Sequence, residues 1–275
     1  MQTFLKTKDF AVSGEEFRLL YDQELDMLVT DPQPKEIDKY YLSSSYISHT
    51  DSFETFSDQL YHLVKKYMLW KKIRMLERYL GKSGSVLDIG AGTGDFLRIA
   101  QKRGWDIEGV EPNPMARGLA IEKQLPLKSD MKDLVGMSFD VITLWHTLEH
   151  IPDLDGQIDA MLECLKEDGI MVVAVPNFKS RDAKYYKEYW AAYDVPRHLW
   201  HFSQEAIERI FKKHQVKLIK KSPLRFDAYY IALLSEKYKN GKSNYLRAFW
   251  MGMRSNISAW QSKEYSSMLY ILKRR

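Results

Sequence analysis

A glycine-rich segment, GAGTG at residues 90–94, lies at the end of the short apolar stretch 85–90. Glycines there let the backbone turn sharply and approach a ligand, and a helix that begins after them offers free N–H groups to an anion. Dinucleotide-binding folds use a similar loop, but their G-x-G-x-x-G pattern needs a third glycine where this chain has Asp95. The acidic Asp88 before the loop is also a poor neighbour for a pyrophosphate. The segment therefore predicts a ligand-binding turn that is not of the dinucleotide type.

A second acidic residue, Glu111, ends another apolar stretch and lies 21 positions after Gly90. In dinucleotide folds an acidic residue about 20 positions after the glycine loop accepts hydrogen bonds from the ribose hydroxyls. The spacing therefore indicates a second contact to the same nucleoside-bearing ligand.

The elements that must position these residues alternate along the chain. Apolar stretches typical of strands occur at 85–90, 105–110, 139–144 and 170–175, and helical patterns occur between them at 96–102, 115–123 and 155–166. A helix at 204–213, a strand at 216–220, helices within 227–261 and a last strand at 268–273 follow. This alternation predicts βαβ units, an α/β fold and a mostly parallel sheet with right-handed crossovers.

Five motifs together resemble the class I S-adenosylmethionine-dependent methyltransferases, in the bacterial small-molecule branch that includes the methyltransferase-23 and quinone O-methyltransferase groups. They are VLDIGAGTGDFL (86–97), GVEPNP (109–114), SDMKDL (129–134), FDVITLWHTLEHIPD (139–153) and LKEDGIMVVAVPN (165–177). The match covers about residues 85–177 and weakens toward the C-terminus. It implies a Rossmann-like, doubly wound seven-stranded sheet in the order 3-2-1-4-5-7-6, with strand 7 antiparallel.

The same resemblance implies S-adenosyl-L-methionine as the cofactor and assigns the residues that hold it. The glycine loop would contact its amino-acid end, Asp88 would orient the loop and the ammonium, and Glu111 would bind the ribose. Asp130 would approach the adenine, although an aspartate that only caps a helix would have the same sequence signature. The expected cofactor-binding residues are Asp88, Gly90, Ala91, Gly92, Glu111, Pro112, Asp130, Met131 and Trp145.

Histidines follow the fourth predicted strand, where the family directs the methyl group. Transfer from a sulfonium needs mainly alignment, but a hydroxyl acceptor must also lose its proton to a base. The candidates are His146 or His150, with Glu149 as the orienting carboxylate, and His198 from a later loop. Structural roles fit these side chains too, and nitrogen or carbon acceptors would need no base.

His-x-x-Glu-His at 146–150 also matches a zinc-protease pattern that needs a long helix. Because Pro152 follows closely, no such helix is expected, and we predict no metal ligands.

The segment WAAYDVPRHLWHF at 190–202 concentrates aromatic and charged residues after the fifth predicted strand. Loops at the carboxyl edge of a parallel sheet commonly bind ligands, and a similar stretch occurs in related bacterial methyltransferases. One interpretation makes Trp190, Tyr193, Arg197 and His198 a substrate wall or lid. The alternative is an Asp194–Arg197 network that fastens the loop.

The flanking regions define the expected domain organisation. Residues 1–50 predict an accessory segment with short strands, similar to a zinc-ribbon appendage of related methyltransferases but without its cysteines. Residues 51–275 predict the methyltransferase domain, including an amphipathic helix at 52–80 and a helical insertion at 227–261. That helix is basic, so it could contact a membrane surface, although packing on the domain is the commoner case.

Composition narrows the classes of partner. The net charge is only +4, without the basic stripe of a nucleic-acid binder, and LWHT at 144–147 is not the Asn/Asp-Pro-Pro-Tyr/Phe motif of nucleic-acid methyltransferases. The single Cys164 excludes an intrachain disulfide and is expected to be a buried apolar residue. No apolar run approaches the ~20 residues needed to span a bilayer, and the first residues lack the hydrophobic region of a secretory signal. These two features predict a cytoplasmic protein.

The resemblance to the small-molecule methyltransferases therefore implies O-methylation of a small hydroxyl-bearing lipid, quinone or sugar. A non-catalytic protein that binds S-adenosylmethionine or a partner, and a nucleic-acid methyltransferase, are the alternatives. The oligomeric state is not indicated.

Overall fold

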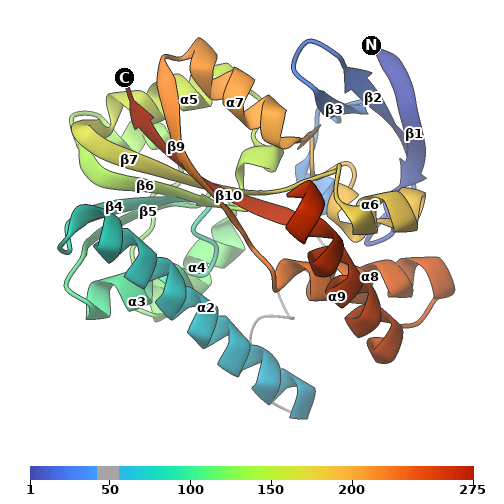
Figure 1. Cartoon of the computed structure of the whole chain (residues 1–275). Coiled ribbons are helices and arrows are strands. Elements are labelled where there is room, and N and C mark those ends of the chain that lie inside the picture. Colours follow the sequence, from blue (N-terminus) through green and yellow to red (C-terminus); the bar gives the residue numbers. More distant parts are fainter. Residues whose placement is uncertain (42–55) are drawn as a thin grey trace.

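The computed structural model describes the chain over residues 1–41 and 56–275. Its centre is a six-stranded sheet in the order β5-β4-β6-β7-β10-β9 (Figure 1). The strands are β4 (Ser85–Ile89), β5 (Asp106–Val110), β6 (Phe139–Trp145), β7 (Leu165–Pro176), β9 (Val216–Pro223) and β10 (Ser267–Arg274). β5, β4, β6 and β7 are parallel, and β10 runs antiparallel to both β7 and β9. The Rossmann-like methyltransferase order and the antiparallel last strand are therefore confirmed.

The sheet has six strands where seven were expected. At the position of the third strand, a single parallel bridge joins Val110 to Lys128. Lys128 donates to Gly109 and accepts from Glu111, but the nearby Pro126 has no N–H to extend the ladder. A 3-10 helix, η2 (Met131–Leu134), then begins three residues after Lys128. The available stretch is thus too short for a strand.

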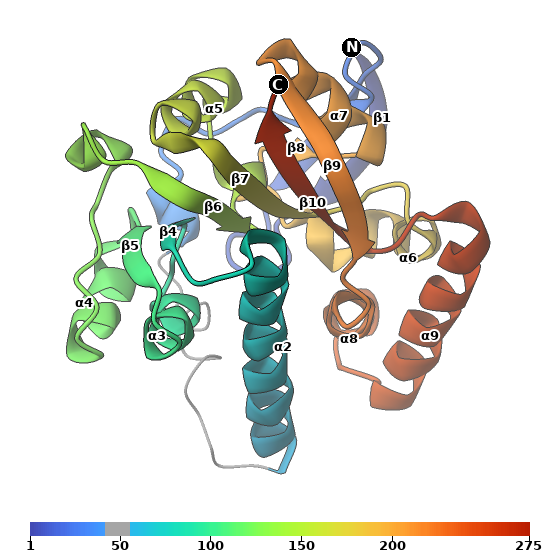
Figure 2. The same ribbon diagram turned by 60° about the vertical axis from the view of Figure 1, so that its left-hand side comes forward.

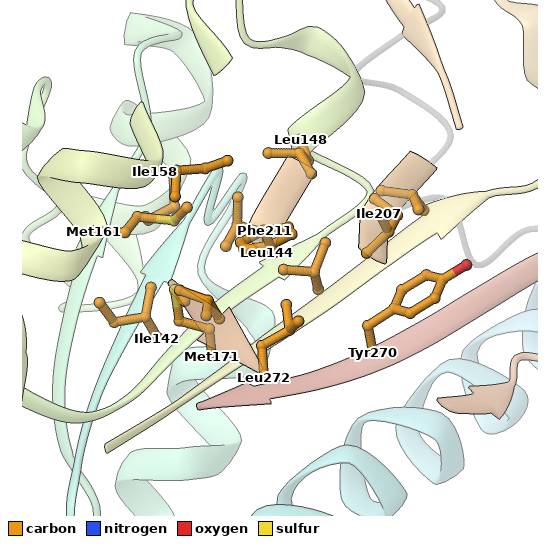
Figure 3. Packing of buried hydrophobic residues seen from close by; sticks show 14 of the residues in the cluster. Ile142, Leu144, Leu148, Ile158, Met161, Met171, Ile207, Phe211, Tyr270 and Leu272 are labelled. Carbon is orange, nitrogen blue, oxygen red and sulfur yellow. The ribbon is translucent and has the colours of Figure 1, made fainter. Parts of the chain in front are cut away.

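Helices cover both faces of the sheet (Figures 1 and 2). α5 (Leu154–Glu163) and α7 (Gln204–Lys213) pack on one face, and α2 (Phe56–Leu80) and α3 (Asp95–Lys102) on the other. Neighbouring residues of β6 show the alternation, since Ile142 faces the first pair of helices and Val141 the second. Figure 3 shows the first core, in which Ile158 and Met161 of α5 and Phe211 of α7 surround Ile142 and Met171.

The remaining helices lie around the edge of the sheet. α4 (Pro114–Glu122) follows β5, α6 (Arg181–Tyr186) follows β7, and the short η3 (Leu148–His150), η4 (Lys187–Tyr189) and η5 (Ala191–Tyr193) lie in connections. α8 (Asp227–Asn240) and α9 (Tyr245–Ser262) form the insertion before β10 that the sequence predicts at 227–261. The predicted start of α2 at residue 52 lies outside the described residues. None of the described helices combines the length and apolarity needed to cross a membrane.

The N-terminal segment forms a separate antiparallel sheet beside α6 and α7 (Figure 1). β1 (Gln2–Lys8), β2 (Glu16–Asp22) and β3 (Met27–Asp31) precede the 3-10 helix η1 (Asp38–Tyr40). The fourth strand, β8 (Trp200–His201), comes from the 190–202 segment and pairs with β3. The appendage with short strands is thus present, and it is joined by main-chain hydrogen bonds to a methyltransferase loop. A boundary at residue 50 lies outside the described residues, and the relation to zinc ribbons stays a prediction.

Candidate functional site

The glycine loop joins β4 to α3 at the carboxyl edge of the sheet, as predicted. Gly90 and Gly92 have φ values of 71° and 55°, in the left-handed region that favours glycine. A Cβ on Gly90 would lie 2.4 Å from Oγ1 of Thr147, whereas one on Gly92 would meet nothing within 4 Å. The loop is therefore packed against the end of β6 at Gly90 and faces open space at Gly92.

Glu111 fastens this loop from the end of β5. Its two carboxylate oxygens accept hydrogen bonds from the backbone N–H groups of Gly92 (2.8 Å) and Asn113 (2.9 Å). Each oxygen keeps a second lone pair, so the carboxylate can still accept from ribose hydroxyls. Arg117 holds the same turn by donating to the carbonyls of Glu111 and Pro112, both at 2.7 Å.

Asp130 and Met131 begin η2 near this edge. Asp130 caps the helix by accepting from the N–H of Lys132 at 2.9 Å, which is the structural alternative that the sequence left open. The predicted contacts of Asp130 and Met131 with an adenine ring remain predictions.

Asp88 lies at the end of β4 beneath the loop and is buried. Thr143 of β6 donates its hydroxyl to Asp88 at 2.6 Å. Burial raises the pKa of Asp88 to about 7, although the Thr143 hydrogen bond opposes the shift. A buried carboxylate with this environment is stabilised by a cation, such as the ammonium of an amino acid.

Lys72 of α2 lies in the same region, and no sequence motif marks this residue. Its ammonium lies 3.9 Å from the centre of the Trp145 ring, a cation–π contact. Burial lowers the pKa of Lys72 to about 8, against the opposing charges of Asp88 and Asp227. The predicted cofactor residue Trp145 therefore forms, with two carboxylates, an environment that accommodates positive charge.

His146 follows β6 and stands between two carboxylates. Its Nε2 lies 3.0 Å from Oδ2 of Asp227, and its Nδ1 lies 3.6 Å from Oε1 of Glu149. Burial alone would lower the pKa of His146, but Asp227 and Glu149 raise it to about 9. The side chain is 36% exposed. Its φ of 57° is left-handed, and such backbone strain is typical of functional positions.

Asp227 was missed because nothing in the local sequence marks it. β9 runs parallel to β7, so its carboxyl end lies at the same edge of the sheet as that of β6. α8 begins shortly after β9. This topology places Asp227 beside His146, although the two residues are 81 positions apart in the sequence.

His150 and His198 form a separate pair. Their rings meet edge to face, with centroids 4.6 Å apart. Nδ1 of His150 donates to the carbonyl of Arg197 (3.0 Å) and lies 3.0 Å from the hydroxyl of Tyr41. Nδ1 of His198 donates to the carbonyl of Ala192 (2.9 Å). Burial lowers the pKa of His150 to about 4. These rings are held by the backbone, unlike His146, and their predicted role as bases remains a prediction.

The rest of the 190–202 segment is turned inward. Trp190, Tyr193 and Arg197 are all buried, and the Trp190 indole donates to Asp182 at 2.8 Å. Arg197 bonds to Asp194, as the stapling alternative proposes, and also to Asp9 and the carbonyl of Tyr40. Substrate contacts by these three residues and by His198 stay predictions, and the packing supports the stapling role of Arg197.

A group of exposed aromatic side chains lies near the start of α8. Tyr67 and Trp70 of α2 stack with centroids 6.2 Å apart, and Tyr67 meets Phe226 edge to face at 6.4 Å. Phe226 directly precedes Asp227, the partner of His146. Figure 2 shows α2 and α8 at the same edge of the sheet. We call Tyr67, Trp70 and Phe226 the aromatic wall.

Comparison with known sequences decides the family. Residues 60–221, more than half of the chain, match Methyltransf_23, a methyltransferase domain. The chain belongs to this family. Members of this family use S-adenosylmethionine. The predicted cofactor and the predicted class of enzyme, methyltransferase, are therefore confirmed.

Curated relatives match a shorter part. The chain is 30% identical over 112 residues to a ubiquinone biosynthesis O-methyltransferase of Psychrobacter arcticus, which is 36% of this chain and 43% of the relative. The namesake of Pseudomonas aeruginosa is 28% identical over 117 residues, 38% of this chain and 50% of the relative. The chain thus spans half or less of the length of these relatives.

Solved structures show the same fold over most of the chain. Magnesium protoporphyrin IX methyltransferase of Synechocystis, with bound SAH, superposes with a TM-score of 0.58 at 12% identity, covering 88% of this chain and 100% of that one. A plantazolicin methyltransferase, also with SAH, gives 0.52 at 14% identity, covering 86% and 93%. At these identities the likeness establishes the fold alone.

Proposed function

We propose that the protein transfers the methyl group of S-adenosylmethionine to a hydroxyl oxygen of a small apolar acceptor, with a phenol-type ring of the quinone class as the first choice. The observation that carries this proposal is the position of His146. It is partly exposed at the carboxyl edge and lies 3.0 Å from Asp227, which follows Phe226 of the aromatic wall, and the next residue, Thr147, packs against Gly90 of the glycine loop.

The cofactor would lie along the carboxyl edge. Gly90, Ala91 and Gly92 would approach its amino-acid end, Asp88 would face the ammonium, and Glu111 would accept from the ribose. Pro112, Asp130 and Met131 would border the adenine, and Trp145 the sulfonium, because an aromatic face stabilises a cation. These placements rest on the family resemblance and on the open side of Gly92.

The acceptor would enter between α2 and α8 against the aromatic wall. Flat side chains such as Trp70 stack on a ring with offset or edge-to-face geometry, which favours a quinol over a sugar. His146 would then turn Nε2 from Asp227 to the hydroxyl and accept its proton in the neutral form of the ring, which the pKa of about 9 favours in alkaline solution. Glu149 would orient the other ring nitrogen. The protein thereby supplies alignment and a proton acceptor, which is what displacement at a sulfonium requires.

A methyl-transfer assay with tritiated S-adenosylmethionine tests the proposal. The panel contains a catechol-type quinol, a sugar and a single-stranded oligonucleotide. We expect transfer to the quinol, with kcat reduced about 10²- to 10⁴-fold in His146→Asn. Trp70→Ala should raise KM roughly tenfold through lost ring contact. The matched control is Trp260→Ala, an exposed tryptophan of α9 outside the aromatic wall, which should leave KM unchanged.

Other outcomes would support the alternatives. Transfer to the oligonucleotide would favour a nucleic-acid methyltransferase. Cofactor binding without SAH release for any acceptor would favour a non-catalytic binding protein.

A further inference from the structure

Three side chains near His146 bring potential metal-ligand atoms close together. Glu149 and His150 belong to η3, and His198 lies between η5 and β8. One ligand atom of each lies within 4.8 Å of the others. Glu149 is 1% exposed, and neither of its carboxylate oxygens has a hydrogen-bond partner among the described residues. Buried charges are normally paired or bound to a metal, so this carboxylate lacks a partner that it needs.

The neighbouring His146 does not supply that partner fully. Its Nδ1 lies 3.6 Å from Oε1 of Glu149, beyond the usual hydrogen-bond distance. Its Nε2 lies 3.0 Å from Oδ2 of Asp227, without hydrogen-bond geometry.

The two histidines are oriented by the backbone as metal ligands commonly are. His150 donates Nδ1–H to the carbonyl of Arg197, and His198 donates Nδ1–H to the carbonyl of Ala192. In the neutral ring the proton on Nδ1 leaves a lone pair on Nε2. A backbone carbonyl that fixes this tautomer is the usual outer contact of a metal-bound histidine.

We propose that Glu149, His150 and His198 bind one divalent transition-metal ion of the Zn²⁺ class, through a carboxylate oxygen and two Nε2 atoms. Two imidazoles and one carboxylate suit Zn²⁺ and its neighbours in the first transition row, whereas Mg²⁺ and Ca²⁺ prefer oxygen ligands alone. Three protein ligands leave a tetrahedral ion one position for water or an acceptor oxygen. Ligand atoms of such an ion lie roughly 3.3 Å apart, so the three side chains close in on binding.

The ion would connect the turn after β6 to the segment that carries β8. It would thereby fix Glu149, which faces His146, and the loop that joins the N-terminal sheet. The His-x-x-Glu-His motif predicted no metal because its protease pattern needs a long helix, and η3 is only a three-residue 3-10 helix. Here His146 is outside the ligand set, and the third ligand comes from His198, 48 positions after His150.

Cobalt titration of the full chain tests the proposal without any measurement of methyl transfer. The protein is freed of affinity tags, stripped with a chelator and titrated with Co²⁺, whose visible absorption reports tetrahedral nitrogen and oxygen ligands. We expect one Co²⁺ per chain, displaced by Zn²⁺, and a rise in the thermal midpoint with Zn²⁺. Glu149→Gln, which keeps the shape of the side chain, should weaken Co²⁺ binding at least tenfold, as should His150→Asn.

The control is His214→Asn. His214 lies 2.8 Å from Asp155 and 2.7 Å from Asp159 near the surface, where an adventitious ion could also bind. This variant should keep the cobalt spectrum and the Zn²⁺-induced rise in midpoint. The proposal is overturned if the wild type shows no tetrahedral cobalt spectrum, if Glu149→Gln binds as tightly as the wild type, or if His214→Asn abolishes binding. Because the apo variants are also compared by thermal midpoint, a loss of folding is distinguished from a loss of the ion.

Discussion

Replacing Arg197 by alanine separates the two roles considered for the 190–202 segment, a substrate wall and a structural staple. The guanidinium is 1% exposed and bonds to both oxygens of Asp194, at 2.7 and 3.0 Å. It also donates to Asp9 at 2.9 Å and to the carbonyl of Tyr40 at 3.2 Å. Burial would raise the pKa of Asp9, but Arg197 and hydrogen bonds from Ser13 and other backbone groups hold it below its usual value. The side chain thus joins the N-terminal segment to the methyltransferase domain.

The expected loss of stability follows from these contacts. Removing one partner of a buried ion pair costs about 3–5 kcal/mol, because the other charge stays buried and unpaired. Asp9 keeps hydrogen bonds from the backbone of Ala11 and Ser13, so we expect the lower end, about 3 kcal/mol. For a chain of this size that corresponds to roughly 6–12 °C in the thermal midpoint.

Arg18→Ala is the matched control in the same N-terminal sheet. Its pair with Asp31, 2.5 Å long, has side chains 56% and 30% exposed. Such exposed pairs contribute about 0–1 kcal/mol, so the free energy of unfolding should barely change. Urea unfolding of both variants, with KM for the acceptor measured alongside, decides the matter. If Arg197→Ala unfolds within about 1 kcal/mol of the wild type while KM rises, Arg197 binds substrate and the structural reasoning fails.

Two further predictions concern the glycine loop and the carboxylate beneath it. Gly90→Ala should lower the free energy of unfolding by about 2–5 kcal/mol, from left-handed strain and from the clash with Thr147, and adding Thr147→Gly should restore the part due to the clash. Equal loss in the single and double variants, measured by urea unfolding, would contradict this contact. Asp88 has a pKa of about 7 in the fold against an ordinary 3.8, so the folded state keeps a proton that the unfolded state releases. The contribution of Asp88 to the free energy of unfolding should therefore fall as pH rises from about 4 to about 7, so the wild type should lose stability over this range relative to Asp88→Asn. The same pH dependence in both proteins would refute the shift.

Local patterns were sufficient for the central elements. Apolar stretches and the helical periods between them lie where β4, β6, α3 and α7 are found, because each buries one face against the sheet. Cys164 is buried, as predicted for a small apolar residue. The third strand is absent because Pro126 has no N–H to extend the ladder beyond the bridge at Lys128.

Long-range contacts explain what the sequence could not predict at the site. Asp227 reaches His146 only because β9 and β6 end at the same edge, and Lys72 reaches Trp145 only because α2 crosses that edge. The inward orientation of Arg197 depends on Asp9, 188 positions away. A cluster of charged and aromatic residues has the same composition whether it lines a pocket or fills a core.

The grouping of three candidate metal ligands also depends on long-range contacts. Glu149 and His150 are adjacent in sequence, but the third member, His198, comes from another element. The burial of Glu149 and the backbone carbonyls that orient the two histidines distinguish the cluster from solvated side chains.

Calorimetric titration of SAH into the purified protein tests the central claim most directly. Gly92→Arg is the matched variant, because the Gly92 position faces open space and a side chain there would enter the proposed cofactor site at a cost of about 1–2 kcal/mol in left-handed backbone strain. NADH serves as the second ligand. The account predicts that the wild type binds SAH, that Gly92→Arg folds but does not, and that neither protein binds NADH. A folded wild type that ignores SAH or prefers NADH would contradict the assignment of the glycine loop, and with it the proposed function.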